Sequence, residues 1–428
     1  MASPLSNRLA RNALWSFVAA VMSRGVAVLA SVLVARTLGK NGLGEFGVLQ
    51  NTVGMAGVFA GFGMGLTATK FTAELRSIDP RKAGRIMAMS IVMAWLAGGL
   101  MTVSLIVFAP QLALYGLAAP GLCNALRLAS PLVVLGAVTG VQAGVLYGFE
   151  DFRIVAKINI ISGLATFPLI ICGVKLMGLA GAILGLVGSQ LISTVLLHRS
   201  LVKKARENCI CLTYRDCLIE RRVVWEFSIP AAASSVLVAP VTWLANMIVV
   251  HHPGGYADMG IFNAANQWGN LVTFVPATLG QIWLPLLANV TGTGDAPRYK
   301  RTFKTAVTFH AVTAFCIAVP LCVAAPLILQ SYGSDFGCGR WVLMWLCLSG
   351  VLASTARPFG FAIASRNRMW VGFWLNGLWG LGLLSSCLFL SGRFDGATGL
   401  AVSMVFAYFV HLYAEAIVVN KYMNNPLC

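Results

Sequence analysis

Two arginines lie inside long apolar segments of the chain, where a charged side chain is costly. Arg24 stands close to the middle of the segment 13–34, and Arg127 stands nearer one end of the segment 121–148. A charge at the centre of a bilayer costs about 2.5–3.5 kcal/mol on insertion scales, so it should face a wet cavity or a partner. Arg24 is the strongest candidate for binding an anion, with a structural pairing to a helix end or a distant acid as the alternative. Arg127 lies close enough to an interface for its side chain to extend into the headgroup layer instead.

Further polar residues in or beside the apolar segments are weaker candidates for binding a substrate. Lys70 and Arg357 lie near segment ends, where they either line a path or extend into the headgroup layer. The remaining candidates are the amides Gln142, Asn246, Asn266 and Gln267. Such amides can hydrogen-bond a polar substrate, but they commonly join helices to one another, and this second role is the simpler interpretation for each.

Acidic residues avoid the centres of the apolar segments. Glu45, Glu226, Asp258 and Glu415 all lie near segment ends. An exporter of cationic drugs needs a buried carboxylate to exchange a proton or sodium ion against its substrate, whereas this sequence offers arginine. An anionic substrate is therefore favoured. Nucleotide-binding and hydrolase motifs are also missing, so the sequence predicts neither an enzyme nor a cofactor or metal.

The composition places these segments in a membrane. The chain has 428 residues, of which 58% are hydrophobic and 11% charged, too few polar side chains to cover a water-soluble globule of this size. Apolar runs of at least about 20 residues suffice for helices that cross the hydrocarbon core. The predicted spans are 13–34, 43–68, 84–108, 121–148, 156–174, 178–198, 223–250, 257–288, 303–330, 338–363, 369–390 and 395–418. In the second of these, Gly57, Gly61 and Gly65 predict a face for close helix contact.

The distribution of positive charge predicts the orientation. If the N-terminus is cytoplasmic, 24 of the 31 Lys and Arg residues fall on cytoplasmic segments and five on outer ones. This asymmetry follows the positive-inside rule and places both termini in the cytoplasm. It also accounts for the net charge of +17 without nucleic acid, because no basic and aromatic motif interleaves.

The two halves of the chain resemble each other. Trp15 and Phe17 recur as Trp225 and Phe227, and Gly44 recurs as Gly260. Further pairs follow in the same order: Phe46 with Phe262, Ala109-Pro110 with Ala325-Pro326, Tyr115-Gly116 with Tyr332-Gly333, and Gly181 near Gly399. Because each half holds an even number of spans, both enter the membrane in the same direction, around a pathway at their interface. The sequence predicts an all-α polytopic membrane protein: a six-helix bundle at 1–198, a basic cytoplasmic linker at 199–222, a second six-helix bundle at 223–428, and a central cavity between the bundles.

The N-terminal region resembles a known family. Residues 11–50, RNALWSFVAAVMSRGVAVLASVLVARTLGKNGLGEFGVLQ, are similar to the opening of polysaccharide-unit flippases of the multidrug, oligosaccharidyl-lipid and polysaccharide exporter superfamily. The similarity rests on Ser23-Arg24 inside the first span, Ala35-Arg36 and Gly39 at its end, and a Gly-x-Phe that opens the second. Lipid II flippases carry a second arginine in this span and usually two further spans. The resemblance therefore favours the O-antigen or capsule branch.

The resemblance implies a function and partners. It implies transport of an undecaprenyl-diphosphate-linked oligosaccharide from the cytoplasmic to the outer leaflet of the bacterial inner membrane, with Arg24 binding the headgroup. The implied partners are this polyprenyl diphosphate substrate, bilayer lipids and polysaccharide polymerase machinery, and the implied state is a monomer. A cation-coupled multidrug exporter of the same superfamily is the alternative, which a buried acid facing the N-terminal cavity would favour. A non-transporting membrane scaffold is a third interpretation, against which the costly charge of Arg24 speaks.

Overall fold

The protein is built from helices. The computed structural model describes residues 4–228, 236–284, 286–287, 290, 296–366, 368–390 and 392–424, and contains no β-strand within these ranges. Two compact units divide the chain: the first comprises 1–37 and 48–236, and the second comprises 38–47 and 237–428. A short segment of the first half of the chain, Leu38–Gly47, thus groups with the second unit.

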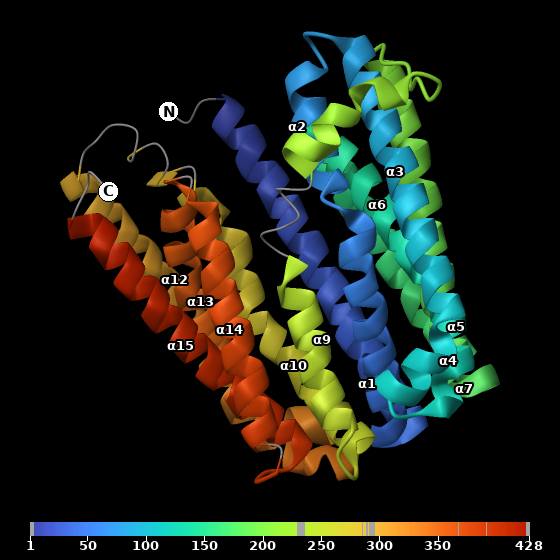
Figure 1. Ribbon diagram of the computed structural model, residues 1–428, viewed down its shortest axis with the longest axis vertical. Helices are drawn as coiled ribbons and strands as arrows, with labels where there is room; N and C mark the ends of the chain where they lie inside the picture. The colour runs from blue at the N-terminus through green and yellow to red at the C-terminus, as the bar shows by residue number, and fades with distance from the viewer. Residues whose placement is uncertain are drawn as a thin grey trace. The chain divides into compact units, whose positions relative to one another are not determined.

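The first unit begins with a long helix that turns within itself. Its helices are α1 (Pro4–Gly61) apart from Leu38–Gly47, α2 (Met64–Leu75), α3 (Pro80–Val107), α4 (Ala109–Gln111), α5 (Cys123–Ala129), α6 (Pro131–Gly148) and α7 (Phe152–Glu207). Short π or 3-10 turns, η1 (Leu112–Gly116), η2 (Pro120–Leu122), η3 (Cys217–Arg221) and η4 (Val224–Ser228), complete the unit. Helix α6 packs against α2, α3 and α7, and therefore forms the centre of the unit (Figure 1).

The second unit is centred on α13. Its helices are α9 (Val238–Val250), α10 (Gly255–Leu279), α12 (Ala296–Gln330), α13 (Arg340–Ala364), α14 (Met369–Leu390) and α15 (Gly396–Asn424), with 3-10 turns η5 (Gly280–Ile282) and η6 (Ser334–Gly339). Helix α13 packs against α10, α12 and α15, while α14 packs against α9 and α15 (Figure 1). Helix α13 therefore forms the centre of the unit, and α14 adds the buried side chains of Leu375 and Leu383 to the core.

The helices confirm the expected polytopic membrane fold. Eight helical segments of the described residues are long and apolar enough to cross a membrane. Two of them, in α1 and α7, hold two of the predicted spans each, because the backbone leaves helical geometry at Gly39 (φ 70°, ψ −174°) and Gly178 (φ 58°, ψ −133°). The seventh and eighth predicted spans correspond to α9 and α10. Only glycine adopts such positive φ values at little cost, so the two turns depend on this residue type.

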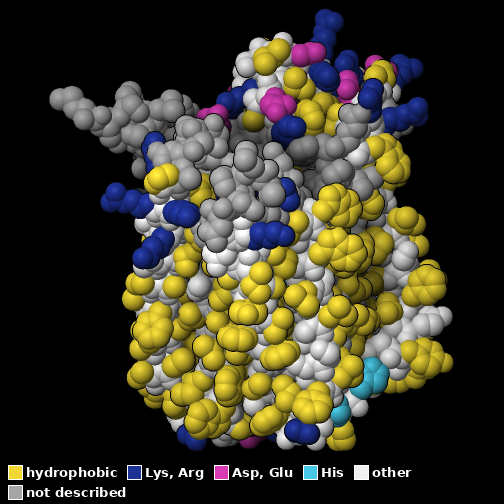
Figure 2. Space-filling view, turned by 60° about the vertical axis from the view of Figure 1, so that its left-hand side comes forward, with side chains coloured by type: hydrophobic (Ala, Val, Ile, Leu, Met, Phe, Trp, Pro, Cys, Tyr) yellow, Lys and Arg dark blue, Asp and Glu magenta, His cyan; other side chains and the backbone are white. Residues whose placement is uncertain are grey.

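Apolar side chains cover the outside of the helices. Leu100, Leu176 and Trp374 are 68%, 83% and 71% exposed. Exposure of such apolar side chains is unfavourable in water but not in contact with lipid tails. Figure 2 shows hydrophobic side chains over most of the face in view, with Lys and Arg gathered mainly toward its upper part and a few at its lower edge. This distribution is that of a chain whose helices are solvated by a bilayer.

Close helix contact occurs at other glycines than those predicted. A Cβ atom added to Gly57 or Gly61 would meet nothing within 4 Å, so the predicted packing role of these two residues is wrong. Gly65 does approach another helix, with the carbonyl oxygen of Gly140 at 3.1 Å from its Cβ position. Helix α1 ends at Gly61 and α2 begins at Met64 after the left-handed Gly63, so Gly65 does not continue the helix face on which the spacing placed Gly57 and Gly61.

The predicted linker is largely packed against the first unit. Residues 199–207 continue α7, and Leu201 and Ala205 are buried there. Farther along, Ile210 and Cys217 are also buried. Buried side chains at four points therefore anchor this basic region to the first unit, while most of its charged side chains stay exposed.

Candidate functional site

A polar cavity lies within the first unit, between α6 and the two arms of α7. Its volume is about 480 Å³. The residues that line it with hydrogen-bonding side chains are Thr139, Tyr147, Asn159, Ser162, Thr166, Ser189, Gln190 and Ser193. The described lining residues include no Asp, Glu, His, Lys or Arg. The cavity therefore offers hydroxyl and amide groups inside an otherwise apolar bundle.

Helical periodicity gathers these side chains on one side of each helix. On α6 the lining positions are 136, 139, 140, 143 and 147; on the first arm of α7 they are 155, 159, 162, 163 and 166, and on the second arm 189, 190, 193 and 197. Spacings of three and four residues place side chains on one helix face. The three polar faces thus point at one space, while the opposite faces of these helices supply the apolar surface.

Several polar groups of the cavity are available to a ligand. Gln190 donates from Nε2 to Thr139 Oγ1 at 2.9 Å, and Ser162 donates to the Ile158 carbonyl at 2.9 Å. By contrast, the side chains of Asn159 and Ser193 make no hydrogen bond within the described part of the chain. A polar side chain without a hydrogen bond is costly inside a membrane, so Asn159 and Ser193 require water or a polar ligand as hydrogen-bond partners.

The two arms of α7 are held together by glycine contacts near their turn. A Cβ atom on Gly181 would overlap the carbonyl oxygen of Gly173, and one on Gly173 would overlap the carbonyl oxygen of Gly181. A Cβ atom on Gly185 would lie 2.8 Å from the backbone of Leu169, which is also too close. The arms therefore run antiparallel in direct contact near Gly178, and the cavity lies farther along them.

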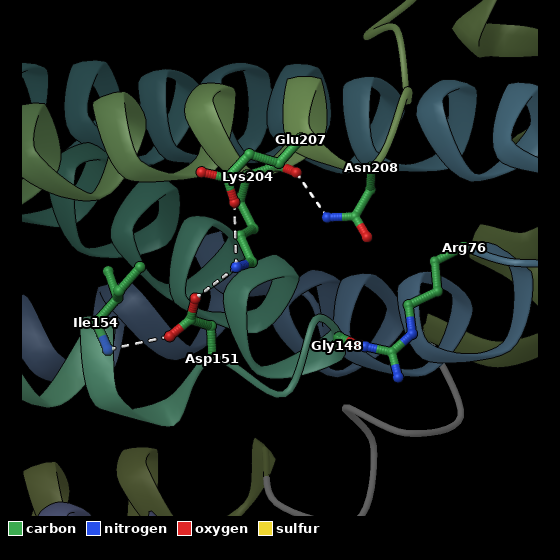
Figure 3. Close-up of polar contacts among 7 residues, drawn as sticks. All are labelled: Arg76, Gly148, Asp151, Ile154, Lys204, Glu207 and Asn208. Atoms are coloured by element: carbon green, nitrogen blue, oxygen red, sulfur yellow. Dashed lines mark hydrogen bonds and ion pairs between the residues drawn. The ribbon is translucent and has the colours of Figure 1, made fainter.

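At the opposite end of the arms, a network of charged residues fixes the connection between α6 and α7 (Figure 3). Asp151 caps α7 by accepting a hydrogen bond from the Ile154 N–H at 3.4 Å, and its second oxygen lies 3.1 Å from Lys204 Nζ. Arg76 donates to the Gly148 carbonyl at 3.3 Å and to Glu150 at 2.7 Å. These contacts hold the first and last turns of α7 beside the end of α6, and so define the spacing of the cavity walls.

The four predicted site residues of the first unit lie outside this cavity. Arg24 is exposed on α1, Arg127 is exposed on α5, and Lys70 is exposed on α2, 4.0 Å from Glu74. Gln142 is buried, and its Oε1 has no hydrogen-bond partner among the described residues. The structure does not gather these four side chains into one site within the first unit.

The four predicted site residues of the second unit are also dispersed. Asn246 is buried on α9 with Oδ1 unpartnered in the described part of the chain. Asn266 and Gln267 are partly buried on α10. Arg357 on α13 interacts electrostatically with His310 and Tyr408, which come from α12 and α15. Arg357 is thus the member of this set that the fold places beside other titratable groups.

Sequence reasoning missed two polar features. The cavity residues are Ser, Thr, Asn and Gln, types too common in membrane helices to stand out without their three-dimensional arrangement. The second feature is the pair His411 and Glu415 on α15, whose Nε2 and Oε1 atoms lie 3.3 Å apart. Glu415 lies near the end of its predicted segment, yet it is only 6% exposed. The i, i+4 spacing of the two residues was the signal available in the sequence.

Comparisons with known proteins agree with an export function. Residues 9–291 match a family described as polysaccharide biosynthesis protein. The chain is 23% identical over 403 residues to the EPS I polysaccharide export inner membrane protein EpsE of Ralstonia nicotianae (strain ATCC BAA-1114 / GMI1000), covering 91% of this chain and 88% of that protein. It is 22% identical over 364 residues to the lipid III flippase of Escherichia coli (strain K12), covering 84% and 85%.

The fold is similar to that of a solved transporter. An inward-facing multidrug resistance MATE family transporter of the MOP superfamily superimposes with a TM-score of 0.82, at 14% sequence identity, covering 96% of this chain and 98% of the other. At this identity the similarity concerns the fold alone.

Proposed function

Because the chain belongs to the polysaccharide biosynthesis protein family, we propose that it flips an undecaprenyl-diphosphate-linked oligosaccharide from the cytoplasmic to the outer leaflet by alternating access. It is a multi-pass inner membrane protein related to polysaccharide exporters and a flippase, and it is not an enzyme. The product would serve the assembly of a surface polysaccharide such as O-antigen, capsule or exopolysaccharide.

The uncharged polar cavity of the first unit is the observation that carries this proposal. A sugar presents many hydroxyl groups and no net charge, and it is recognised by side chains that both donate and accept hydrogen bonds. Asn159, Ser193 and Gln190 are of this kind. Tyr147 adds an aromatic ring, which can cover the apolar face of a sugar. We assign the cavity to part of the glycan.

The diphosphate requires a different environment. Arg24 is our candidate for it, because the planar guanidinium makes paired, charge-assisted hydrogen bonds to phosphate oxygens. Arg127, Lys70 and Arg357 would contribute positive charge along the path, and the amides Gln142, Asn246, Asn266 and Gln267 would hydrogen-bond polar groups. Moving one negative charge outward across an inside-negative membrane is favourable by about 2.3 kcal/mol per 100 mV, so the membrane potential can assist export.

The alternative of a cation-coupled multidrug exporter receives less support. It calls for an acid facing the N-terminal cavity, and the described lining of that cavity contains none. The buried Glu415 belongs to the second unit and is paired with His411. A cavity of hydroxyl and amide groups suits a neutral glycan better than an organic cation.

The organisation of the chain in the membrane is part of the same proposal. Both termini lie in the cytoplasm, the two six-helix bundles are 1–198 and 223–428 with the basic segment 199–222 joining them, and the protein acts as a monomer beside polysaccharide polymerase machinery. The excess of Lys and Arg on the segments assigned to the cytoplasm supports this orientation.

Complementation of a bacterial strain that lacks its polysaccharide-unit flippase tests the proposal. Gly136→Leu adds a side chain where a Cβ meets nothing within 4 Å, and so fills the cavity without a backbone clash. Gly99→Leu, at an equally open position of α3, is the matched control. At matched expression, wild type and Gly99→Leu should restore surface glycan, whereas Gly136→Leu should accumulate lipid-linked intermediate. If both variants restored surface glycan equally, the cavity would not be part of the transport pathway. If wild type failed to restore glycan in strains of several glycan types, the proposed function would be contradicted.

A further inference from the structure

An apolar groove of about 430 Å³ lies in the first unit, separate from the polar cavity. Three pieces of chain form it: the break between α1 and α2, one face of α3, and residues 221–225, at the end of η3 and the start of η4. Its wall includes Phe62, Met64, Met89, Met93 and Trp225, and one cation, Arg221, stands among them. Met64 and Met89 are 1% and 0% exposed and form the floor of the groove, so the apolar surface open to a ligand comes from Phe62, Met93 and Trp225. A single positive charge stands beside this surface.

The face of α3 gives the groove a direction. Met89, Met93 and Ala97 follow one another at four-residue intervals on one face of α3. Met89 is fully buried, so the accessible part of this strip, from Met93 to Ala97, is about 6 Å long at 1.5 Å rise per residue. Methionine side chains are flexible and polarizable, and adapt to irregular apolar ligands. A hydrocarbon chain with methyl branches fits beside such side chains, between the aromatic rings of Phe62 and Trp225.

Arg221 is the cation that nothing in the described structure neutralises. Its neighbour Glu220 is already engaged, since Oε1 accepts hydrogen bonds from Arg85 Nε at 3.0 Å and Nη2 at 2.8 Å. Arg221 itself has no ion pair or hydrogen bond from its side chain within the described residues. An anionic group at this place would therefore gain a partner without displacing one.

The backbone beside the groove is strained. Phe62 adopts φ 45° and Gly63 φ 69°, which interrupts the helix between α1 and α2. A left-handed conformation is unfavourable for a bulky residue, and such residues persist where the surrounding structure or a function requires them. Here the strain places Phe62, which is 42% exposed, in the wall of the groove.

The geometry points to a site for the lipid part of the substrate: the groove binds the phosphate-proximal isoprenoid units of a polyprenyl diphosphate, and Arg221 binds an oxygen of the lipid-linked phosphate. Arg24 remains the candidate for the sugar-linked phosphate. This inference rests on the proposed function and deepens it, because it separates a lipid site from the glycan cavity. The apolar wall matches the hydrocarbon chain, and the unpaired cation matches the charge at the head of that chain.

Binding of undecaprenyl phosphate to the purified protein in phosphatidylcholine nanodiscs, followed by native mass spectrometry, tests the inference. Arg221→Gln should weaken binding about tenfold or more, because a charge-assisted hydrogen bond is lost. Met93→Trp should weaken binding by filling the groove. Arg222→Gln, which removes the same charge one residue away and outside the wall, should bind as wild type does. Thermal unfolding of each variant in the same nanodiscs identifies any loss of binding that comes from misfolding.

Competing probes identify the ligand class. Unlabelled phosphatidylglycerol in excess should leave binding of the polyprenyl probe unchanged, and undecaprenol without phosphate should bind about as weakly to wild type as undecaprenyl phosphate does to Arg221→Gln. Equal competition by phosphatidylglycerol would make the groove a general phospholipid site and overturn the inference. Wild-type affinity in folded Arg221→Gln and Met93→Trp would overturn it as well, while surface-glycan rescue by wild type would leave the flippase standing.

Discussion

Gly44 and Gly260 occupy equivalent places in the two sequence repeats, and each lies against the backbone of the other's helix. A Cβ on Gly44 would overlap the carbonyl oxygen of Tyr256, and a Cβ on Gly260 would overlap that of Lys40. Residues 40 and 256 are themselves separated by the same offset of 216 as 44 and 260. The contact therefore repeats itself about a pseudo-twofold relation, within the second unit.

This crossing predicts matched effects of two substitutions. Gly44→Ala and Gly260→Ala should each destabilise the protein by about 1–3 kcal/mol, the usual cost of overpacking, and by similar amounts. Gly54→Ala lies on the same helix as Gly44 at a position where a Cβ meets nothing within 4 Å, so it should be neutral or mildly stabilising. Thermal unfolding in detergent measures all three. If Gly44→Ala and Gly260→Ala both unfolded at the wild-type temperature, α1 and α10 could move apart at this contact without loss of stability, which would contradict the prediction.

Substitution of Arg24 tests its assignment to the diphosphate. Arg24→Ala should abolish or strongly reduce surface glycan and accumulate lipid-linked intermediate, because a charged partner of the phosphate is removed. Arg24→Lys should retain part of the activity, since it keeps the charge but loses the fork of donors. Quantification of the intermediate at matched membrane expression gives the result. If Arg24→Ala were fully active in a strain that wild type rescues, Arg24 would not be the residue that binds the diphosphate.

The network at the α6–α7 connection should contribute to stability through Asp151. Asp151→Ala removes the cap of α7 and the partner of Lys204, and should cost about 1–2 kcal/mol. Asp151→Asn keeps a capping oxygen and should cost less. Glu207→Gln breaks an exposed pair with the same lysine, which lies at 3.2 Å, and should change stability by only about 0.5 kcal/mol. Thermal unfolding ranks the three, and an equal effect of Asp151→Ala and Glu207→Gln would contradict the cap.

The pair of His411 and Glu415 predicts non-additive behaviour. His411→Leu leaves the buried carboxyl group of Glu415 without its imidazole partner and should destabilise by about 3–5 kcal/mol. The double change His411→Leu with Glu415→Leu removes both polar groups and should recover much of the loss, because apolar replacement of a buried pair is often neutral. A double-mutant cycle on thermal stability provides the measurement. Simple additivity would mean that the two side chains do not depend on each other.

Apolar length and charge are enough to predict the helices, because a bilayer imposes both. In the part of the chain that the structure describes, each of the twelve predicted spans falls wholly or partly on helices. The pairing of Gly44 with Gly260 is visible in the sequence as part of the repeat. The cavity could not be predicted, since Thr139, Asn159 and Ser193 are ordinary membrane-helix residues until α6 and α7 bring them together. The prediction from the GxxxG spacing in the second span was wrong because such spacing shows only that one helix face carries small residues. It does not show whether another helix packs against that face.

Direct measurement of flipping in reconstituted vesicles tests the central claim. Vesicles that contain the purified protein and a lipid-linked oligosaccharide on one leaflet are treated with a membrane-impermeant glycosidase, and the accessible fraction of glycan is followed over time. Wild type and Gly99→Leu should make the oligosaccharide accessible much faster than protein-free vesicles do, whereas Gly136→Leu should remain near the protein-free rate. Transfer by wild type no faster than in protein-free vesicles, with folded protein and an intact lipid-linked substrate, would contradict the account.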